Sequence, residues 1–220
     1  MPESQPAPRW RLFTALSPSA EAVEHLDRAL DTVREEPSAG GEETGIRWLP
    51  SDLWHVTLVF LGWLDPGHVE AVSRAGSRAA GESLPFEWRL SSAGGFPSSA
   101  AARVLWMGVE ADRNRLQRLF RAVRREMRAV RVPVERRPYQ PHLTVARVRR
   151  SQGAARPRTA EVVSSLQDYR GPAQQAERVV LMRSHPSHRT VYETLAAWPL
   201  GSAAGQTPPE ENGSASQSQP

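Results

Sequence analysis

The sequence predicts an α+β fold with two similar halves arranged around a central cleft. Short apolar runs of strand length alternate along the chain with few segments of helical periodicity, which is typical of α+β proteins. Two of the strand candidates, one in each half of the chain, also carry a histidine followed two residues later by a threonine. This repeat predicts a pseudo-twofold cleft into which each half presents one imidazole and one hydroxyl.

The expected strands are apolar runs rich in β-branched and aromatic residues. They are the segments 10–16, 46–49, 54–61, 86–91, 103–109, 142–148, 178–183 and 190–198.

Three helices are expected between these strands. The first begins at Ser17 and Pro18, because serine is a favoured N-cap and proline is favoured at the first helical position. The second begins at Asp65 and Pro66, and the third follows Asp112. The apolar stripe of the first helix comprises Ala22, Leu26, Ala29 and Val33. The third helix is arginine-rich on one face, and its apolar face comprises Leu116, Leu119, Phe120, Val123, Met127 and Val130.

The two ends of the chain have the composition of tails. Residues 1–8 are polar and proline-rich, and residues 201–220 contain almost no side chain able to enter a core, so both are expected to be disordered. Residues 9–200 are expected to form a single domain with a flexible loop at 35–45. Because no apolar run reaches the length of a membrane span or a secretory signal, the protein is expected to be cytoplasmic.

The composition excludes several kinds of chemistry. The chain has no cysteine, which excludes disulfides, thiolate zinc sites and thiol nucleophiles. All 28 basic residues are arginines, so Schiff-base chemistry and the lysine of phosphate-binding loops are also excluded. Arginines crowd the segment 124–150, which favours a phosphate-bearing partner. A solvated arginine-rich surface without a partner is the alternative.

The first polar pair lies in the segment WHVTLVFL, residues 54–61. Since the side chains of a strand alternate between its faces, His55 and Thr57 are expected to share one face. The opposite face is expected to be apolar and comprises Trp54, Val56, Leu58 and Phe60.

The second polar pair lies in the segment HLTVARV, residues 142–148, where His142 and Thr144 share a face in the same way. One such pair is more often structural, because threonine is a favoured strand residue and a lone strand histidine is often at the surface. Two pairs in comparable settings call for a common explanation.

Two facing imidazoles are suited to acid–base catalysis. Their ordinary pKa near 6.5 lets one accept a proton while the other donates one close to neutral pH. Threonine hydroxyls beside them can donate hydrogen bonds to phosphoryl oxygens and so stabilise charge without a metal. This division of roles fits the hydrolysis of a phosphodiester.

The two pairs resemble the HxTx signatures of the 2H phosphoesterases, and most closely their bacterial RNA 2',3'-cyclic phosphodiesterase, or LigT-like, branch. The likeness extends over nearly all of residues 9–200 and includes RLFTAL at Arg11, IRWLPSDLWHVTLVFLGWL at Ile46, GGFPSSAAARVLWMGV at Gly94, RPYQPHLTVARV at Arg137 and VYETLAAWPL at Val191. It implies a bilobal fold in which antiparallel sheets flank a central cleft and helices lie on the outside.

The resemblance also implies a role for each signature residue. His142 is the expected proton acceptor, which deprotonates the water that attacks phosphorus. His55 is the expected proton donor to the departing 3' oxygen of the ribose, which leaves a 2'-phosphomonoester. Thr57 and Thr144 are expected to hold the phosphate.

Arg147 follows the second signature, as in similar proteins, which implies a contact with the anionic substrate. Strict alternation places Arg147 on the face opposite His142, so this role requires a β-bulge. The alternative is a solvent-facing arginine at the end of a strand.

No cofactor and no metal are expected, because His185 and His188 lack a third ligand and a carboxylate cluster. The expected substrate is RNA, or a nucleotide, with a 2',3'-cyclic phosphate end, and the protein is expected to act as a monomer away from membranes. Two alternatives stay open: another 2H activity, such as reversible 2'-5' joining of RNA ends, and a non-catalytic RNA-binding module that uses the arginine-rich helix.

Overall fold

A computed structural model describes residues 8–34, 45–135, 138–149, 159–185 and 190–201. The strands are β1 (Trp10–Leu16), β2 (Ile46–Trp48), β3 (Val56–Leu64), β4 (Phe86–Phe96), β5 (Val104–Ala111), β6 (His142–Val148), β7 (Gln174–Ala176), β8 (Arg178–His185) and β9 (Val191–Pro199). The helices are α1 (Ala20–Arg34), α2 (Val69–Gly81), α3 (Arg113–Ala129) and α4 (Thr159–Ser165). Apart from three single residues at their edges, the expected tails and the loop at 35–45 lie outside the described residues.

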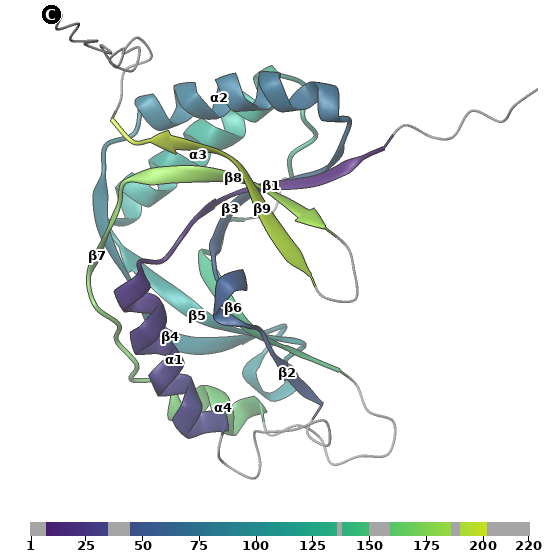
Figure 1. The fold of residues 1–220 in the computed structure, drawn as a ribbon. Coiled ribbons are helices and arrows are strands. Elements are labelled where there is room, and N and C mark those ends of the chain that lie inside the picture. The colour runs from purple at the N-terminus through teal and green to yellow at the C-terminus, as the bar shows by residue number, and fades with distance from the viewer. Residues whose placement is uncertain (1–7, 35–44, 136–137, 150–158, 186–189, 202–220) are drawn as a thin grey trace, which may run out of the picture.

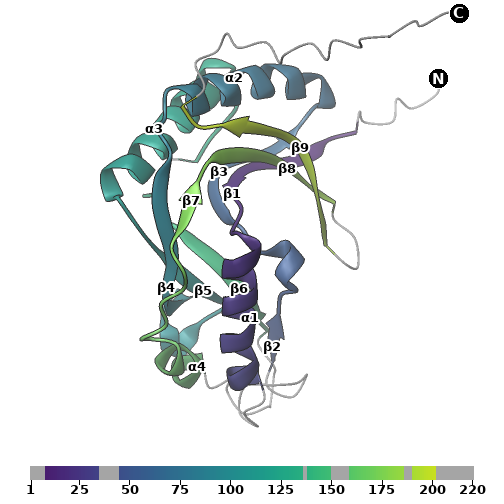
Figure 2. The same ribbon diagram turned by 60° about the vertical axis from the view of Figure 1, so that its left-hand side comes forward.

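The nine strands of the described chain form one antiparallel sheet. Its order is β7-β4-β5-β6-β3-β1-β8-β9, and β2 pairs with β6. The sheet curls strongly, so that one of its faces is concave (Figures 1 and 2). Its two halves meet between β3 and β6, where Val56 is the registered partner of Leu143. We call this junction between β3 and β6 the seam, and it joins the two expected halves of the molecule. The predicted α+β fold is confirmed.

The helices are divided between the two halves. Helices α2 and α3 lie together over the half formed by β3, β1, β8 and β9, whereas α1 and α4 lie beside the other half (Figures 1 and 2). The expected apolar face of α3 is buried, except that Val130 follows the helix as its C-cap. None of the helices in the described part of the chain has the length and apolarity needed to span a bilayer.

Two of the three expected helix starts are confirmed and one is shifted. Asp112 accepts hydrogen bonds from two amides of the first turn of α3, and Asp65 caps a short 3₁₀ turn that continues into α2. Helix α1 begins later than expected. The Ser19 hydroxyl accepts from the Ala22 amide at 3.1 Å, so Ser19 rather than Ser17 caps this helix.

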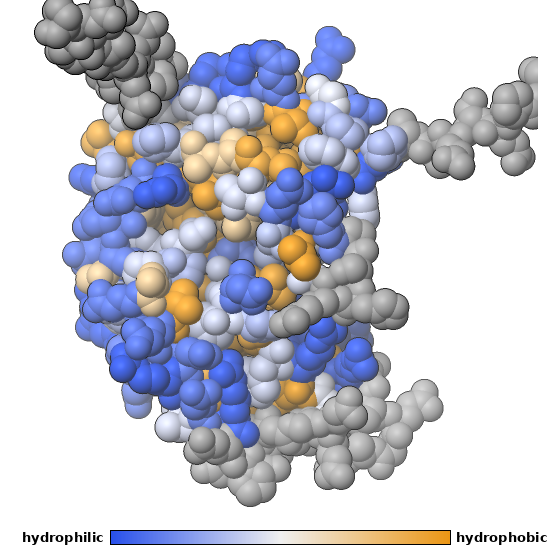
Figure 3. Space-filling view, viewed as in Figure 1, coloured by the Kyte–Doolittle hydropathy of each residue, from blue (hydrophilic) through white to orange (hydrophobic). Residues whose placement is uncertain are grey.

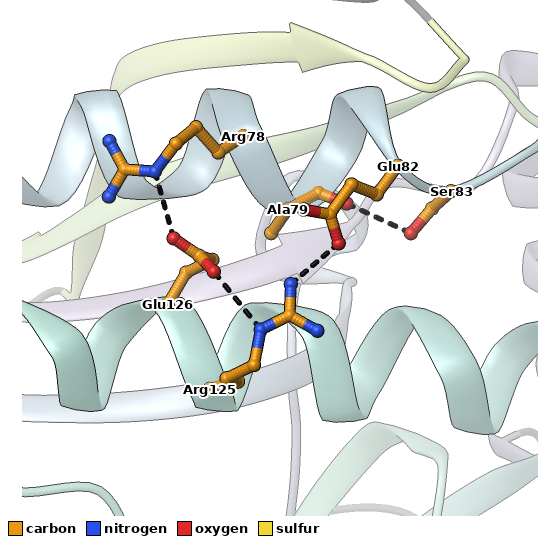
Figure 4. A network of polar contacts seen from close by, with 6 residues as sticks. All are labelled: Arg78, Ala79, Glu82, Ser83, Arg125 and Glu126. Atoms are coloured by element: carbon orange, nitrogen blue, oxygen red, sulfur yellow. Dashed lines mark hydrogen bonds and ion pairs between the residues drawn. The ribbon is translucent and has the colours of Figure 1, made fainter.

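Arg125 on the arginine-rich face of α3 is neutralised by Glu82, the C-cap of α2, and by Glu126 of α3 itself (Figure 4). Arg125 donates to Glu82 at 2.5 Å and to Glu126 at 3.1 Å, and Arg78 donates to Glu126 at 2.9 Å. Such exposed pairs each contribute little to stability. They do occupy part of the positive charge that an RNA-binding groove on this helix would need.

Candidate active site

The register at the seam brings the two polar pairs to one place. Val56 and Leu143 lie opposite each other and are both 0% exposed. In an antiparallel pair, the neighbours of two opposed residues also lie across from each other, and they point to the other face. Each signature histidine therefore lies across from the threonine of the other signature. The four side chains that meet in this way are His55, Thr57, His142 and Thr144, and all four are half-buried.

Both imidazoles are held by a carbonyl two residues upstream. The Nδ1 atom of His55 lies 2.8 Å from the Leu53 carbonyl oxygen, and that of His142 lies 2.7 Å from the Gln140 carbonyl oxygen. Because a carbonyl only accepts, each Nδ1 carries the hydrogen. Each Nε2 is then the atom that accepts a proton in the neutral ring and donates one in the protonated ring.

The electrostatic environment keeps both rings neutral more readily than in water. Burial lowers the pKa of His55, the hydrogen bond to Leu53 opposes this, and the charges of His142 and Arg147 lower the pKa further. Burial also lowers the pKa of His142, against the hydrogen bond to Gln140. Because the charge of one imidazole acts on the other, the two rings lie within electrostatic reach. A bound phosphate anion would raise both pKa values.

A β-bulge turns Arg147 toward this site. On β6, Thr144 and Ala146 have partners on β5, whereas Val145 between them has none. The extra residue reverses the alternation, so that Val145 and Ala146 are both buried and Arg147 emerges on the face of the second signature. Its positive charge lowers the pKa of His55, in agreement with this placement. The bulge that a substrate contact by Arg147 requires is therefore present.

Strand β3 has the same irregularity at the same place. Thr57 and Val59 have partners on β1, whereas Leu58 between them has none. Leu58 and Val59 are both buried, and Phe60 emerges on the face of the first signature with 48% of its surface exposed. The expectation that Phe60 shares the apolar face of the strand is therefore wrong, because the bulge reverses the alternation after Thr57.

Aromatic rings lie against both imidazoles. The ring centroids of Phe13 and Tyr192 are 4.8 Å and 5.1 Å from that of His55, and the ring of Phe96 is 5.0 Å from that of His142. Sequence reasoning missed Tyr192 and Phe96 as site residues. The proximity of these two rings to the imidazoles depends on strand order and register, which sequence patterns do not reveal. The only signal in the sequence was that both residues lie in stretches that resemble the family.

Open space adjoins the second signature. A cavity of about 580 Å³ is lined in part by Trp106 and Gly108, which are the β5 partners of Thr144 and His142. A larger cavity of about 720 Å³ lies between the end of β1 and strands β7 to β9, and no signature residue lines it. The position of the imidazoles, rather than the size of a cavity, therefore locates the site.

Within the described ranges, no group of three or more histidine, cysteine, aspartate and glutamate side chains could hold a metal ion. His185 lies 2.8 Å from a carboxylate oxygen of Glu193, while His188 lies outside the described residues.

Comparison with known proteins places these features in a family. Residues 23–187 match the model of the 2'-5' RNA ligase superfamily. An RNA 2',3'-cyclic phosphodiesterase of Geobacillus stearothermophilus is 34% identical over 165 residues, which are 73% of this chain but only 50% of that protein. A protein of the same name from Methanothermobacter thermautotrophicus is 27% identical over 177 residues, 79% of this chain and 89% of that protein.

The fold is shared with a solved structure. The apo form of LigT from E. coli aligns with a TM-score of 0.66 and 24% identity, over 88% of this chain and 99% of that chain. Sequence and fold therefore agree with the resemblance of the two signatures, and the chain belongs to the 2'-5' RNA ligase superfamily, the family of the 2H phosphoesterases.

Proposed function

We propose that the protein hydrolyses 2',3'-cyclic phosphates at RNA ends or on nucleotides, by metal-independent catalysis with His55 and His142. The observation that carries the proposal is the convergence at the seam of two imidazoles, each fixed through Nδ1. The names of the two relatives, both RNA 2',3'-cyclic phosphodiesterases, support the same chemistry.

In this mechanism the two imidazoles move protons in opposite directions. The Nε2 atom of His142 accepts a proton from water, whose oxygen forms the new bond to phosphorus. The bond between phosphorus and the 3' oxygen breaks, and Nε2 of His55 donates its proton to that oxygen. The products are a 2'-phosphomonoester and a free 3' hydroxyl. Proton exchange with solvent then restores both rings.

The other polar groups stabilise the charge that develops on phosphorus oxygens. Thr57 and Thr144 donate hydrogen bonds from opposite sides, because each lies across from the histidine of the other strand. Arg147 supplies the fixed positive charge on the same face. The same charge disfavours protonated His55 in the free protein, so binding of the phosphate anion is what populates the acid form.

The direct test is product analysis with chelator-treated protein and a panel of 2',3'-cyclic nucleotides. We expect 2'-phosphomonoesters without added metal, identified chromatographically against both isomers. Strict dependence on a divalent cation, or a 3'-phosphate product, would contradict the proposed mechanism. If variants lacking either histidine turned over normally, the assigned roles of His55 and His142 would be wrong. If the wild-type protein bound RNA but opened none of these substrates, the alternative of a non-catalytic RNA-binding module would gain support.

A second candidate is the joining of RNA ends through a 2'-5' linkage, which the name of the matched family favours. The geometry is compatible, because a 5' hydroxyl can take the place of the attacking water while the leaving group is unchanged. Incubation of an RNA with a cyclic phosphate end and one with a 5' hydroxyl would distinguish the two. A linked product that accumulates faster than the phosphomonoester would favour joining.

The proposal further takes residues 9–200 as one catalytic domain that acts as a cytoplasmic monomer, with residues 1–8 and 201–220 as dispensable tails. Sedimentation velocity should give a monomer, and a variant lacking both tails should keep its activity. A stable dimer, or loss of turnover on trimming, would contradict this part of the proposal.

A further inference from the structure

The bulge on β3 begins a row of exposed aromatic side chains on the face of the site. Phe60 is 48% exposed, and its ring centroid is 6.1 Å from that of Phe13, which in turn lies against His55. A second unpaired residue, Leu61, precedes Gly62, whose φ of +76° is readily adopted only by glycine. Beyond Gly62, Trp63 is 51% exposed.

The register places Trp63 on the same face as Phe60. Trp63 is the β1 partner of Arg11, and Phe60 is the partner of Phe13, two residues further along β1. Residues two apart in a strand share a face, and opposed residues of paired strands do so too. Trp63 and Arg11 therefore continue the face on which Phe13 contacts His55.

Positive charge accompanies these rings. The charges of Arg147 and Arg11 both lower the pKa of Tyr192, against the larger raising effect of its burial. Tyr192 therefore lies within electrostatic reach of both guanidinium groups. On the face that Figure 3 shows, apolar residues reach the surface in small groups among hydrophilic ones. Phe60 and Trp63 are among the few large hydrophobic side chains that are exposed in the described part of the chain.

We propose that β3 and β1 form a track for the last two nucleotides of a single-stranded RNA. The terminal base stacks on Phe60, the preceding base stacks on Trp63, and Arg11 contacts the phosphate between them. Aromatic platforms interleaved with arginines are the usual means of holding single-stranded nucleic acid without sequence readout. The track rests on the proposed function and narrows it, because it makes an RNA end the preferred substrate over a cyclic mononucleotide.

Hydrolysis of two substrates tests the track. One is a 2',3'-cyclic mononucleotide and the other a short oligoribonucleotide with the same end. Trp63→Ala should lower kcat/KM for the oligonucleotide about tenfold, mainly through KM, and leave the mononucleotide unchanged. Trp63→Phe should restore most of the loss. Phe60→Ala should lower kcat/KM for both substrates, because both contain the terminal base.

Arg11→Gln provides an independent measurement. It should weaken binding of the oligonucleotide and reduce the slope of log affinity against log salt by about 0.7, the contribution of one phosphate contact on a single strand. Leu84→Ala is the matched control, because Leu84 is 66% exposed but lies outside strands β1 and β3. Leu84→Ala should leave the hydrolysis of both substrates unchanged.

Binding of a labelled, non-cyclic oligoribonucleotide, followed by fluorescence anisotropy, separates the track from the proposed chemistry. If no cyclic phosphate is opened but Trp63→Ala still weakens binding, the proposed function fails and the track stands. If Trp63→Ala affects both cyclic substrates equally, or neither, the track is wrong. A shift from dimer to monomer in Trp63→Ala without loss of RNA binding would assign this face to self-association instead.

Discussion

The two halves of the sheet present the same pair of a histidine and a threonine but differ in the side chain that follows this pair. In each half, a histidine and a threonine are followed by a bulge, and the fifth residue after the histidine emerges on the same face as that histidine. That residue is Phe60 in one half and Arg147 in the other. On the roles proposed above, the pseudo-twofold symmetry of the sheet is kept in the residues that would move protons and is broken in the residues that would contact the base and the phosphate.

The largest expected effect tests the part that the halves share. His55→Ala and His142→Ala should each lower kcat by about 10² to 10⁴-fold, because each removes one proton-transfer group. Wild-type kcat/KM should follow a bell-shaped pH profile with its maximum below about 6.5, since both pKa values are lowered.

The same variants assign the direction of proton transfer. The alkaline limb should vanish in His55→Ala, which lacks the acid, and the acidic limb in His142→Ala, which lacks the base. Circular dichroism controls for folding. Loss of the same limb in both variants would contradict the assigned roles.

The threonines test whether the halves contribute equally to charge stabilisation. Thr57→Val and Thr144→Val keep the shape of the side chain but remove the hydroxyl, and each should lower kcat by about 10²-fold, as loss of one transition-state donor does. Steady-state kinetics of both variants checks this. A large effect in one variant alone would show that the phosphate is held by one half of the sheet.

The residues after the bulges test the broken symmetry. Arg147→Gln should raise KM about tenfold, as expected for loss of a hydrogen bond to a charged group. It should also raise the pKa of His55, because a nearby positive charge is removed. Titration of the imidazole by NMR would measure this shift. Phe60→Leu is the matched variant in the other half and should leave the pKa of His55 in place.

The smallest effect concerns stability. Because the pKa of each signature histidine is lowered in the folded state, the unfolded chain binds more protons just below pH 6.5. The free energy of unfolding should therefore fall as the pH drops below about 6.5 and through the folded-state pKa values. Urea unfolding at a series of pH values measures this. In a variant with both histidines replaced by asparagine, the free energy of unfolding should depend less steeply on pH. An unchanged slope would show that other groups cause the pH dependence.

The sequence predicted those features that depend on a few neighbouring residues. Alternation over three residues was enough to place each histidine and its threonine on one face. Asp112 correctly predicted the start of its helix, because its side chain caps the first turn. The strands 142–148 and 10–16 were predicted with the bounds that the structure has.

Features that depend on a partner strand could not be predicted in the same way. Phe60 was assigned to the wrong face because Leu58 has no partner on β1, which no pattern within β3 reveals. Strand β7 was missed because its three residues, Gln174 to Ala176, carry no strand-like composition and are ordered by pairing with β4. Helix α4 was missed as well, since it is only seven residues long.

The seam sets the spacing of the imidazoles in a particular way. Where β3 meets β6, the register consists of one pair of opposed residues, Val56 and Leu143, and both belong to the hydrophobic core. The distance between the imidazole rings of His55 and His142 therefore depends less on backbone hydrogen bonds between β3 and β6 than on the volumes of the Val56 and Leu143 side chains. Exchanges among valine, leucine and isoleucine at these two positions would therefore change the distance between the rings of His55 and His142 without altering any group proposed to contact the substrate.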